Sequence, residues 1–359
     1  MKIGLYTIHE WNNYGAMLQT FATCEALKML NVEVEVVNLY TKQTELENSY
    51  LSSKISIKAL VKNIYALLSP SIHRKKKNFK LFHDRLPLSK RFYSTDEVFA
   101  EPIHYNLHLV GSDQTWNLEK GFSEKNYFWL DFLPENERKA SFAASFGAEN
   151  VKPELLSQIH EKLKSFSYVT TREESGVRIL KAANINSFAV MDPTFLIDWN
   201  AFVSKEPLIS GDYILAYGFG AKGPANYLIK QIKNIFNDCN IVGVSVSTTH
   251  PFAYDKFYQK AGPLEFLNLI KNAKFVITAS FHGAAFAIHF RKNFFVLAHD
   301  TRNSRIESML LRCGLLSQMI YPYQPILQNA TKIDYSTVNE KIKDVSIETL
   351  KKLKEIVTC

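Results

Sequence analysis

The segment Ser280–Gly283 places a histidine where a buried strand is expected to turn into a helix. Residues 275–279 form an uncharged, mostly apolar run that predicts a strand, and small residues after Gly283 predict a helix. Backbone N–H groups at such a turn point forward and favour an anion. Histidine transfers protons near neutral pH. The pattern therefore predicts an acid/base group, His282, beside an anion site. The alternative is a hydrogen-bonded core histidine.

Three other expected strand ends carry residues suited to ligand binding. Asn13 and Gly15 lie between the first strand and the first helix, where Gly15 lets the backbone approach a ligand, unless this is a plain turn. Asp113 suits hydrogen bonds from sugar hydroxyls and Trp116 a stacking contact, although Asp113 could instead cap a short helix. Arg172 suits bidentate binding of a carboxylate or phosphate, with an ion pair to one of the two following glutamates as the alternative.

These expected strand ends belong to two series of alternating strand-like and helix-like segments. The first series predicts strands at 3–8, 32–39, 106–110, 139–145 and 168–171, with helices at 16–30, 153–166 and from about 173. The second predicts strands at 213–217, 240–246, 275–279 and 294–297, with helices at 225–236, 264–272, 283–290 and 303–313. Alternation of this kind predicts parallel sheets covered by helices. We therefore expect an α/β protein with two doubly wound, Rossmann-like domains facing a cleft.

The expected domains divide the chain into three parts. Residues 1–191 form the N-terminal domain with a basic insertion at 54–91, residues 192–333 the C-terminal domain, and residues 334–359 a helix that packs back on the body. A length of 359 residues is ample for two cores. The N-terminus is expected to be a strand and not a signal peptide. The four cysteines form no CxxC pair, which indicates neither a zinc site nor disulfides and fits a reducing cytoplasm.

Positive charge is concentrated in residues 54–91. This segment has eleven basic residues and one acidic residue, a net charge of +10, whereas the rest of the chain has −2. Such a local patch, without a recognised binding module, argues against a general nucleic-acid partner. Lys54, Lys58 and Lys62 recur at helical spacing opposite an apolar stripe, and a basic run follows at 74–77. Of two alternatives, the pattern favours a core-packing helix that has a solvated lysine face over peripheral docking on an anionic membrane.

Five motifs together resemble the polysaccharide pyruvyl transferase family. They occur in the family's order and comprise residues 13–19 (NYGAMLQ), 111–117 (GSDQTWN), 171–175 (TREES), 192–194 (DPT) and 280–283 (SFHG). The resemblance implies a fold like the two-domain glycosyltransferases called GT-B. It also implies phosphoenolpyruvate as donor, a sugar or lipid-linked oligosaccharide as acceptor, and a pyruvate ketal as product in cell-surface polysaccharide synthesis.

The resemblance also implies roles for individual residues. His282 matches a histidine held to be essential, and Arg172 matches a donor-binding arginine. Some members have an arginine two residues before the histidine, where this chain has Ser280; Arg302 and Arg305 are the nearest substitutes in sequence. We therefore expect catalysis by His282 and donor binding by Arg172, Ser280, Gly283, Arg302 and Arg305. The residues expected to bind the acceptor are Asn13, Tyr14, Gly15, Asp113, Gln114 and Trp116.

The expected reaction requires no metal, and phosphoenolpyruvate is a co-substrate and not a cofactor. No cluster of metal ligands is evident in the sequence. The expected location is the cytoplasm, with peripheral contact on the inner membrane face as a further prediction. Two alternatives remain at this point: a GT-B glycosyltransferase that uses a sugar nucleotide, and a non-catalytic polysaccharide-assembly protein.

Overall fold

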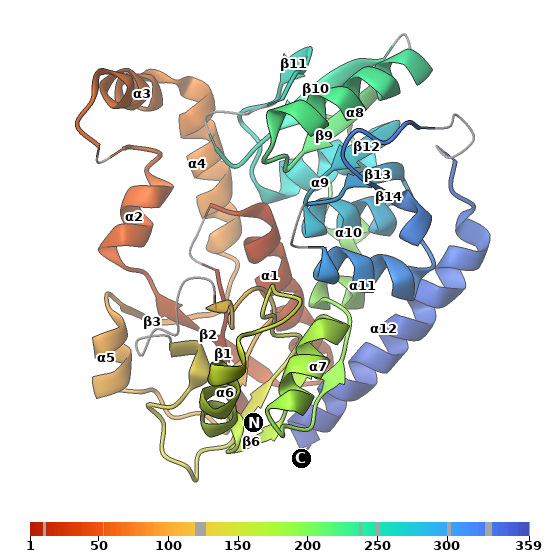
Figure 1. Cartoon of the computed structure of the whole chain (residues 1–359). Helices are drawn as coiled ribbons and strands as arrows, with labels where there is room; N and C mark the ends of the chain where they lie inside the picture. Colours follow the sequence, from red (N-terminus) through yellow and green to blue (C-terminus); the bar gives the residue numbers. More distant parts are fainter. Residues whose placement is uncertain are drawn as a thin grey trace.

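The chain folds into two parallel β-sheets, one above the other in Figure 1, with helices packed around them. The computed structural model describes residues 1–9, 12–52, 54–118, 127–236, 239–247, 252–299, 303–326 and 332–358. Within these residues, each of the two large sheets has six strands. This architecture confirms the predicted α/β class with two Rossmann-like domains.

The N-terminal sheet has the strand order β3-β2-β1-β4-β5-β6, and all its neighbouring strands are parallel. Its strands are β1 (Lys2–Tyr6), β2 (Glu33–Leu39), β3 (Leu88–Phe92), β4 (Leu107–Val110), β5 (Lys139–Ser141) and β6 (Phe166–Tyr168). The helices of this lobe are α1 (Tyr14–Met29), α2 (Lys42–Asn48), α3 (Ile57–Leu68), α4 (Pro70–His83), α5 (Thr95–Ala100), α6 (Leu156–Leu163) and α7 (Glu174–Ala182). A short parallel pair, β7 (Thr170–Thr171) and β8 (Phe188–Ala189), precedes the crossover to the second lobe.

The C-terminal sheet repeats this order as β11-β10-β9-β12-β13-β14, again with parallel neighbours. Its strands are β9 (Tyr213–Tyr217), β10 (Asn240–Val244), β11 (Lys256–Phe257), β12 (Phe275–Thr278), β13 (Asn293–Leu297) and β14 (Met319–Ile320). Its helices are α8 (Lys222–Ile235), α9 (Pro263–Lys271), α10 (Phe281–His289) and α11 (Ser304–Cys313), followed by α12 (Tyr335–Thr358). Short 3₁₀ turns include η2 (Tyr127–Trp129), η3 (Pro153–Leu155), η4 (Pro193–Leu196), η5 (Trp199–Ala201) and η6 (Leu316–Gln318).

The shared strand order fixes where a ligand site can form. In each sheet the chain reverses its winding direction beside the first strand, between β1 and β4 in one lobe and between β9 and β12 in the other. Parallel sheets bind ligands at the carboxyl ends of the strands at this reversal. The loops that leave these four strands therefore carry the residues that matter most for function.

One hydrophobic core joins the two lobes. Tyr14, at the start of α1, stacks on Phe266 of α9 with a ring-centroid distance of 4.5 Å. Its hydroxyl donates to the Ala261 carbonyl oxygen at 3.0 Å. Met17 and Phe21 from the same helix belong to the same buried cluster as the strands of the C-terminal sheet. Because α1 follows β1 directly, this packing fixes the reversal points of the two sheets relative to each other.

Helix α12 also connects the lobes and runs down the right side of Figure 1. Near its start, Val338 packs in the cluster of the C-terminal lobe. Near its end, Leu353 and Ile356 pack against the N-terminal sheet. The Arg138 guanidinium donates to the Ile356 carbonyl oxygen at 2.6 Å, which caps the end of the helix. Both ends of α12 are therefore anchored, each to a different lobe.

Candidate functional site

His282 lies in the first turn of α10, directly after the buried strand β12. Its side chain is buried between the two lobes, and Nδ1 packs against Gly15 at the start of α1. A methyl group built on Gly15 would lie only 2.0 Å from Nδ1 and 2.4 Å from Cγ. The other ring nitrogen, Nε2, faces the Asp192 carboxylate at 3.7 Å. The imidazole is therefore held between the backbone of one lobe and a carboxylate from the crossover.

Asp192 is the centre of a buried charged cluster. Its Oδ2 accepts hydrogen bonds from Arg172 Nη1 at 2.8 Å and from Ser112 Oγ at 3.0 Å. Its Oδ1 accepts from the Thr194 backbone N–H at 3.0 Å, which starts η4. Burial alone would raise the pKa of Asp192, but the hydrogen bonds and charges of His282 and Arg172 outweigh it and hold the pKa well below its usual range. Asp192 is therefore an anion that faces the His282 imidazole.

Arg172 lies behind this cluster, in the protein interior. Its guanidinium carbon lies 4.3 Å from the centroid of the Phe281 ring, and Nη2 lies 3.6 Å from Asp113 Oδ1. The alternative of an ion pair with Glu173 or Glu174 is therefore wrong, because the partner is Asp192. Nε and Nη2 of Arg172 are buried and make no hydrogen bond within the described part of the chain. Arg172 is not among the residues that line the cavity described next, so the structure places this predicted donor-binding residue behind the cavity wall.

A cavity of about 330 Å³ opens beside His282 and is lined by both lobes. Six of the predicted site residues line it: Asn13, Asp113, Gln114, Ser280, His282 and Arg305. The strand ends expected to converge are therefore brought together in one place. Asp113 has a positive φ of 78° and pairs across an isolated bridge with Ala144, in the segment after β5, which fixes its position at the rim.

Three further lining residues were missed from the sequence. Tyr217 ends β9, His299 follows β13, and Asn117 lies in the segment that follows β4. Burial raises the pKa of Tyr217 to about 12, so its hydroxyl stays protonated in the cavity. His299 donates from Nε2 to the Ala279 carbonyl oxygen at 2.9 Å, which leaves Nδ1 as an acceptor in the neutral ring. Their places at or after the ends of central strands, β9 and β13 in the second sheet and β4 in the first, were the signal that pointed to them.

Two of the predicted acceptor-binding residues lie in the core and not in the cavity. Tyr14 forms the contact between the lobes described above. Trp116 is fully buried and stacks on Trp129 at 5.5 Å, while its Nε1 donates to the Phe128 carbonyl oxygen at 3.2 Å. Neither ring offers a free face to a sugar, because burial of a large aromatic side chain stabilises the core more than exposure at a polar rim would. Arg302 lies outside the described residues.

The helix N-termini are capped by their own side chains. Asn13 Oδ1 accepts from the Gly15 N–H at 3.0 Å, and Ser280 Oγ accepts from the Gly283 N–H at 3.4 Å. The expected anion contacts at these two N–H groups are therefore already occupied by caps. Gly283 serves close packing instead, because a methyl group there would lie 2.3 Å from Thr278 Oγ1.

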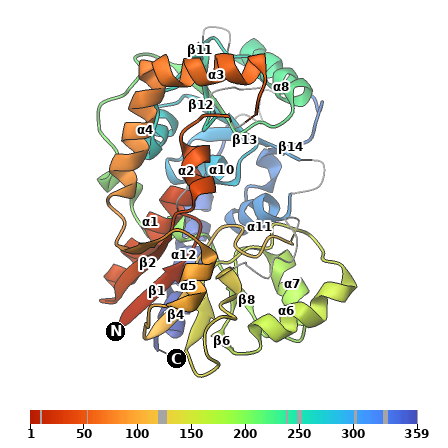
Figure 2. The same ribbon diagram turned by 90° about the vertical axis from the view of Figure 1, so that its left-hand side faces the viewer.

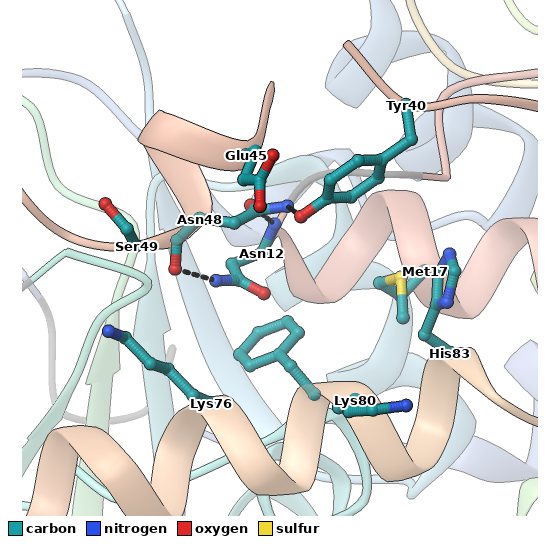
Figure 3. A pocket seen from close by; sticks show the side chains of 10 residues that line it. Asn12, Met17, Tyr40, Glu45, Asn48, Ser49, Lys76, Lys80 and His83 are labelled. Carbon is teal, nitrogen blue, oxygen red and sulfur yellow. Dashed lines mark hydrogen bonds between the residues drawn. The ribbon is translucent and has the colours of Figure 1, made fainter. Parts of the chain in front are cut away.

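A separate cavity of about 360 Å³ lies between α2 and α4. Figure 3 shows Lys76 and Lys80 from α4 across from Glu45 and Asn48 from α2. Asn12 and Asn48 are joined here by two hydrogen bonds: the Asn12 backbone N–H donates to Asn48 Oδ1, and Asn12 Nδ2 donates to the Asn48 carbonyl oxygen. No predicted catalytic residue lines this cavity. Among the described residues, no three His, Cys, Asp or Glu side chains are grouped so as to hold a metal ion.

Comparison of the sequence with models of known protein families identifies the family of this chain. A family model described as polysaccharide pyruvyl transferase matches residues 13–301. The chain belongs to the polysaccharide pyruvyl transferase family. The match spans all five motifs noted in the sequence and confirms the resemblance. Membership of this family indicates a transferase that acts in polysaccharide modification. No curated protein matches the chain in sequence.

Several solved structures resemble this family member along its whole length. UDP-N-acetylglucosamine 2-epimerase from Rickettsia bellii is 8% identical with a TM-score of 0.50, covering 99% of this chain and 96% of that one. UDP-GlcNAc 2-epimerase from Methanocaldococcus jannaschii is 14% identical with a TM-score of 0.50, covering 100% and 99%. The N-terminal domain of trehalose-6-phosphate phosphatase from Candida albicans is 9% identical with a TM-score of 0.51, covering 99% and 96%. At such identities the likeness shows the fold alone, which is GT-B-like.

Proposed function

We propose that this protein transfers the pyruvyl group of phosphoenolpyruvate to a sugar and forms a pyruvate ketal. The methylene carbon of the donor takes a proton, and a sugar hydroxyl adds to the adjacent carbon as that carbon becomes cationic. A second hydroxyl of the same sugar then displaces phosphate, and the two hydroxyl protons are released. The observation that supports this reaction is the His282–Asp192 pair beside a polar cavity between the lobes.

His282 is the proposed proton donor. With Nε2 directed at Asp192, the nitrogen left for proton transfer is Nδ1, which lies beside Gly15. The Asp192 carboxylate stabilises the charged imidazolium, as a buried acid partner does in other histidine-dependent sites. Asp192 is therefore a positioning residue that keeps the ring oriented for proton transfer to the donor's methylene carbon.

Arg305 is the proposed partner of the donor's anionic groups, because it lines the cavity from α11. The unbonded N–H groups of Arg172 provide further positive charge from behind Phe281. Both guanidinium groups suit a carboxylate or phosphate. Ser280 carries no charge and serves as the cap of α10, so the arginines take over the role that an arginine has at that position in some members. Arg302 stays a prediction.

The sugar is proposed to bind on the opposite wall. Asn13, Asp113 and Gln114 come from the N-terminal lobe and line the same cavity as His282. Their amide and carboxylate groups can accept and donate hydrogen bonds to several hydroxyls at once. A sugar seated there would present two of its hydroxyls toward the donor, which is the requirement for a cyclic ketal.

The test separates this reaction from sugar-nucleotide transfer. Calorimetry measures the binding of phosphoenolpyruvate and of UDP-glucose, and phosphate release from phosphoenolpyruvate is followed with a panel of nitrophenyl glycosides as acceptors. We expect phosphoenolpyruvate binding that weakens at least about tenfold in Arg305→Ala, and acceptor-dependent phosphate release that falls by at least about 100-fold in His282→Ala. His104→Ala, at an exposed histidine, is the control.

Three results would count against the proposal. Near-wild-type turnover by a folded His282→Ala protein would remove the proton-transfer role. Binding of UDP-glucose with no binding of phosphoenolpyruvate would favour a glycosyltransferase. If neither compound bound, a non-catalytic assembly protein would explain the fold better.

A further inference from the structure

Helix α3 carries its apolar stripe on the outside of the molecule. The side chains of Ile57, Leu60 and Leu68 are 83%, 60% and 74% exposed, and Val61 and Ile64 between them are exposed as well. The buried residues of the helix are instead Ala59 and Ala66, on the opposite side. The alternative of a core-packing helix with a solvated lysine face is therefore wrong. A stripe of this kind is rare on a protein surface that contacts only water.

The helix is held in this orientation by small and polar contacts. Ala66 packs with Tyr50 and Ile72, and Tyr65 donates from its hydroxyl to Gln259 Oε1 at 2.9 Å. Its first turn is capped by Ser56, which accepts from the Ala59 N–H at 3.1 Å. Figures 1 and 2 show α3 at the outer end of α4, at the top of both views. The apolar stripe is thus a fixed outer face and not a frayed end.

Exposed basic residues lie near the stripe in the chain. Lys54 precedes α3, Lys58 lies on it, and Arg74 and Lys77 lie on α4, all of them exposed. Lys75, in the middle of the basic run, turns inward and donates to the Ser245 and Val246 carbonyl oxygens. It therefore belongs to the contact between α4 and the segment after β10 and not to the surface. The four exposed basic residues are the basic border of the α3 face.

A cavity of about 390 Å³ is lined by Lys62 of α3 together with Asn13, Asn48, Tyr50 and Val246. Asn13 also lines the cavity beside His282, so the two cavities share a lining residue.

We propose that α3 docks on an anionic lipid surface, with its apolar stripe in the interfacial layer and its basic border among the headgroups. No helix in the described parts of the chain has the length and apolar character needed to cross a bilayer, so the contact is peripheral. A second copy of this chain is the competing occupant. A two-fold contact through α3 would bring two segments of net charge +10 together, whereas anionic headgroups compensate that charge. This inference does not depend on the reaction proposed above.

Vesicle flotation tests the docking. We expect the full chain to float with phosphatidylcholine vesicles that contain about 30% phosphatidylglycerol, and to float much less with pure phosphatidylcholine. The triple variant Leu60→Ser, Ile64→Ser and Leu68→Ser should lose at least about tenfold in binding, because each change removes inserted apolar surface. The double variant Leu311→Ser and Ile347→Ser removes exposed apolar side chains elsewhere and should bind like the unchanged protein.

A charge variant completes the test. Lys58→Gln combined with Arg74→Gln and Lys77→Gln should weaken binding to the anionic vesicles and flatten its dependence on salt. Circular dichroism and thermal unfolding of each variant show whether the fold is kept. Absence of flotation by the unchanged chain would overturn the proposal. A dimer in sedimentation velocity that the triple serine variant dissolves, without any vesicle binding, would assign the face to self-association.

Discussion

Gly15→Ala should abolish activity without unfolding the protein. The added methyl group would lie 2.0 Å from His282 Nδ1 and 2.4 Å from Cγ. Ordinary contact between such atoms requires about 3.5 Å, so the ring must move by about 1.5 Å. The ring has little room on its other side, because Nε2 faces Asp192. It must therefore leave its position between α1 and the carboxylate.

A displacement of about 1 Å in a catalytic group costs on the order of 100-fold in rate, so we expect at least that loss in phosphoenolpyruvate-dependent phosphate release. The free energy of unfolding should fall by about 1–3 kcal/mol at most, as for an overpacked core position. Gly220→Ala is the matched control, since a methyl group there meets open space. A Gly15→Ala protein with near-normal turnover would show that His282 does not act from the position described.

Three further predictions follow from the buried charges. Asp192→Asn should lower the free energy of unfolding by about 3–5 kcal/mol in urea titrations, because Arg172 loses its buried partner; an unchanged midpoint would contradict this pairing. Arg172→Lys should weaken phosphoenolpyruvate binding in calorimetry at least about tenfold, because an ammonium group does not reproduce the fork-shaped contacts, and an equal affinity would exclude that role. Burial lowers the pKa of Lys75 to about 7, below its ordinary value of 10.5. Between these two pH values the unfolded chain binds more protons than the folded chain does. The free energy of unfolding should therefore rise with pH from about 7 to 10.5. The free energy of unfolding of Lys75→Met should rise less over the same pH range. If the free energies of unfolding of the two proteins changed in parallel with pH, the lowered pKa of Lys75 would be disproved.

The centre of each sheet could be predicted because its strands are apolar runs with clear ends. The predicted strand 213–217 coincides with β9, and β12 differs from its prediction by one residue. The edge strands β3, β11 and β14 were not predicted. β11 and β14 have two residues each, and β3 has an exposed Lys-Arg pair in its middle, so none shows the pattern of a buried strand. Short edge strands are identified by their pairing with a neighbouring strand in the structure and not by their own composition.

The site was partly predictable for the same reason. Residues at the ends of central strands converge by topology, so the sequence indicated Asn13, Asp113 and His282 together. The central position of Asp192 was not predicted, although its Asp-Pro-Thr motif was noted, because its partners come from both lobes and are distant in the sequence. The aromatic residue Trp116 was placed at the rim for its chemistry, but burial decided its position. Sequence patterns locate strand ends well and side-chain directions poorly.

The stacking of Tyr14 on Phe266 has a consequence for how the enzyme turns over. Two-lobed folds often work by swinging apart and together, but here the hinge region is filled by aromatic rings shared by both lobes. Pulling the lobes apart would wet those rings and break the hydroxyl contact to Ala261. Separation of the lobes is therefore opposed by the same aromatic contact that positions α1 beside α9.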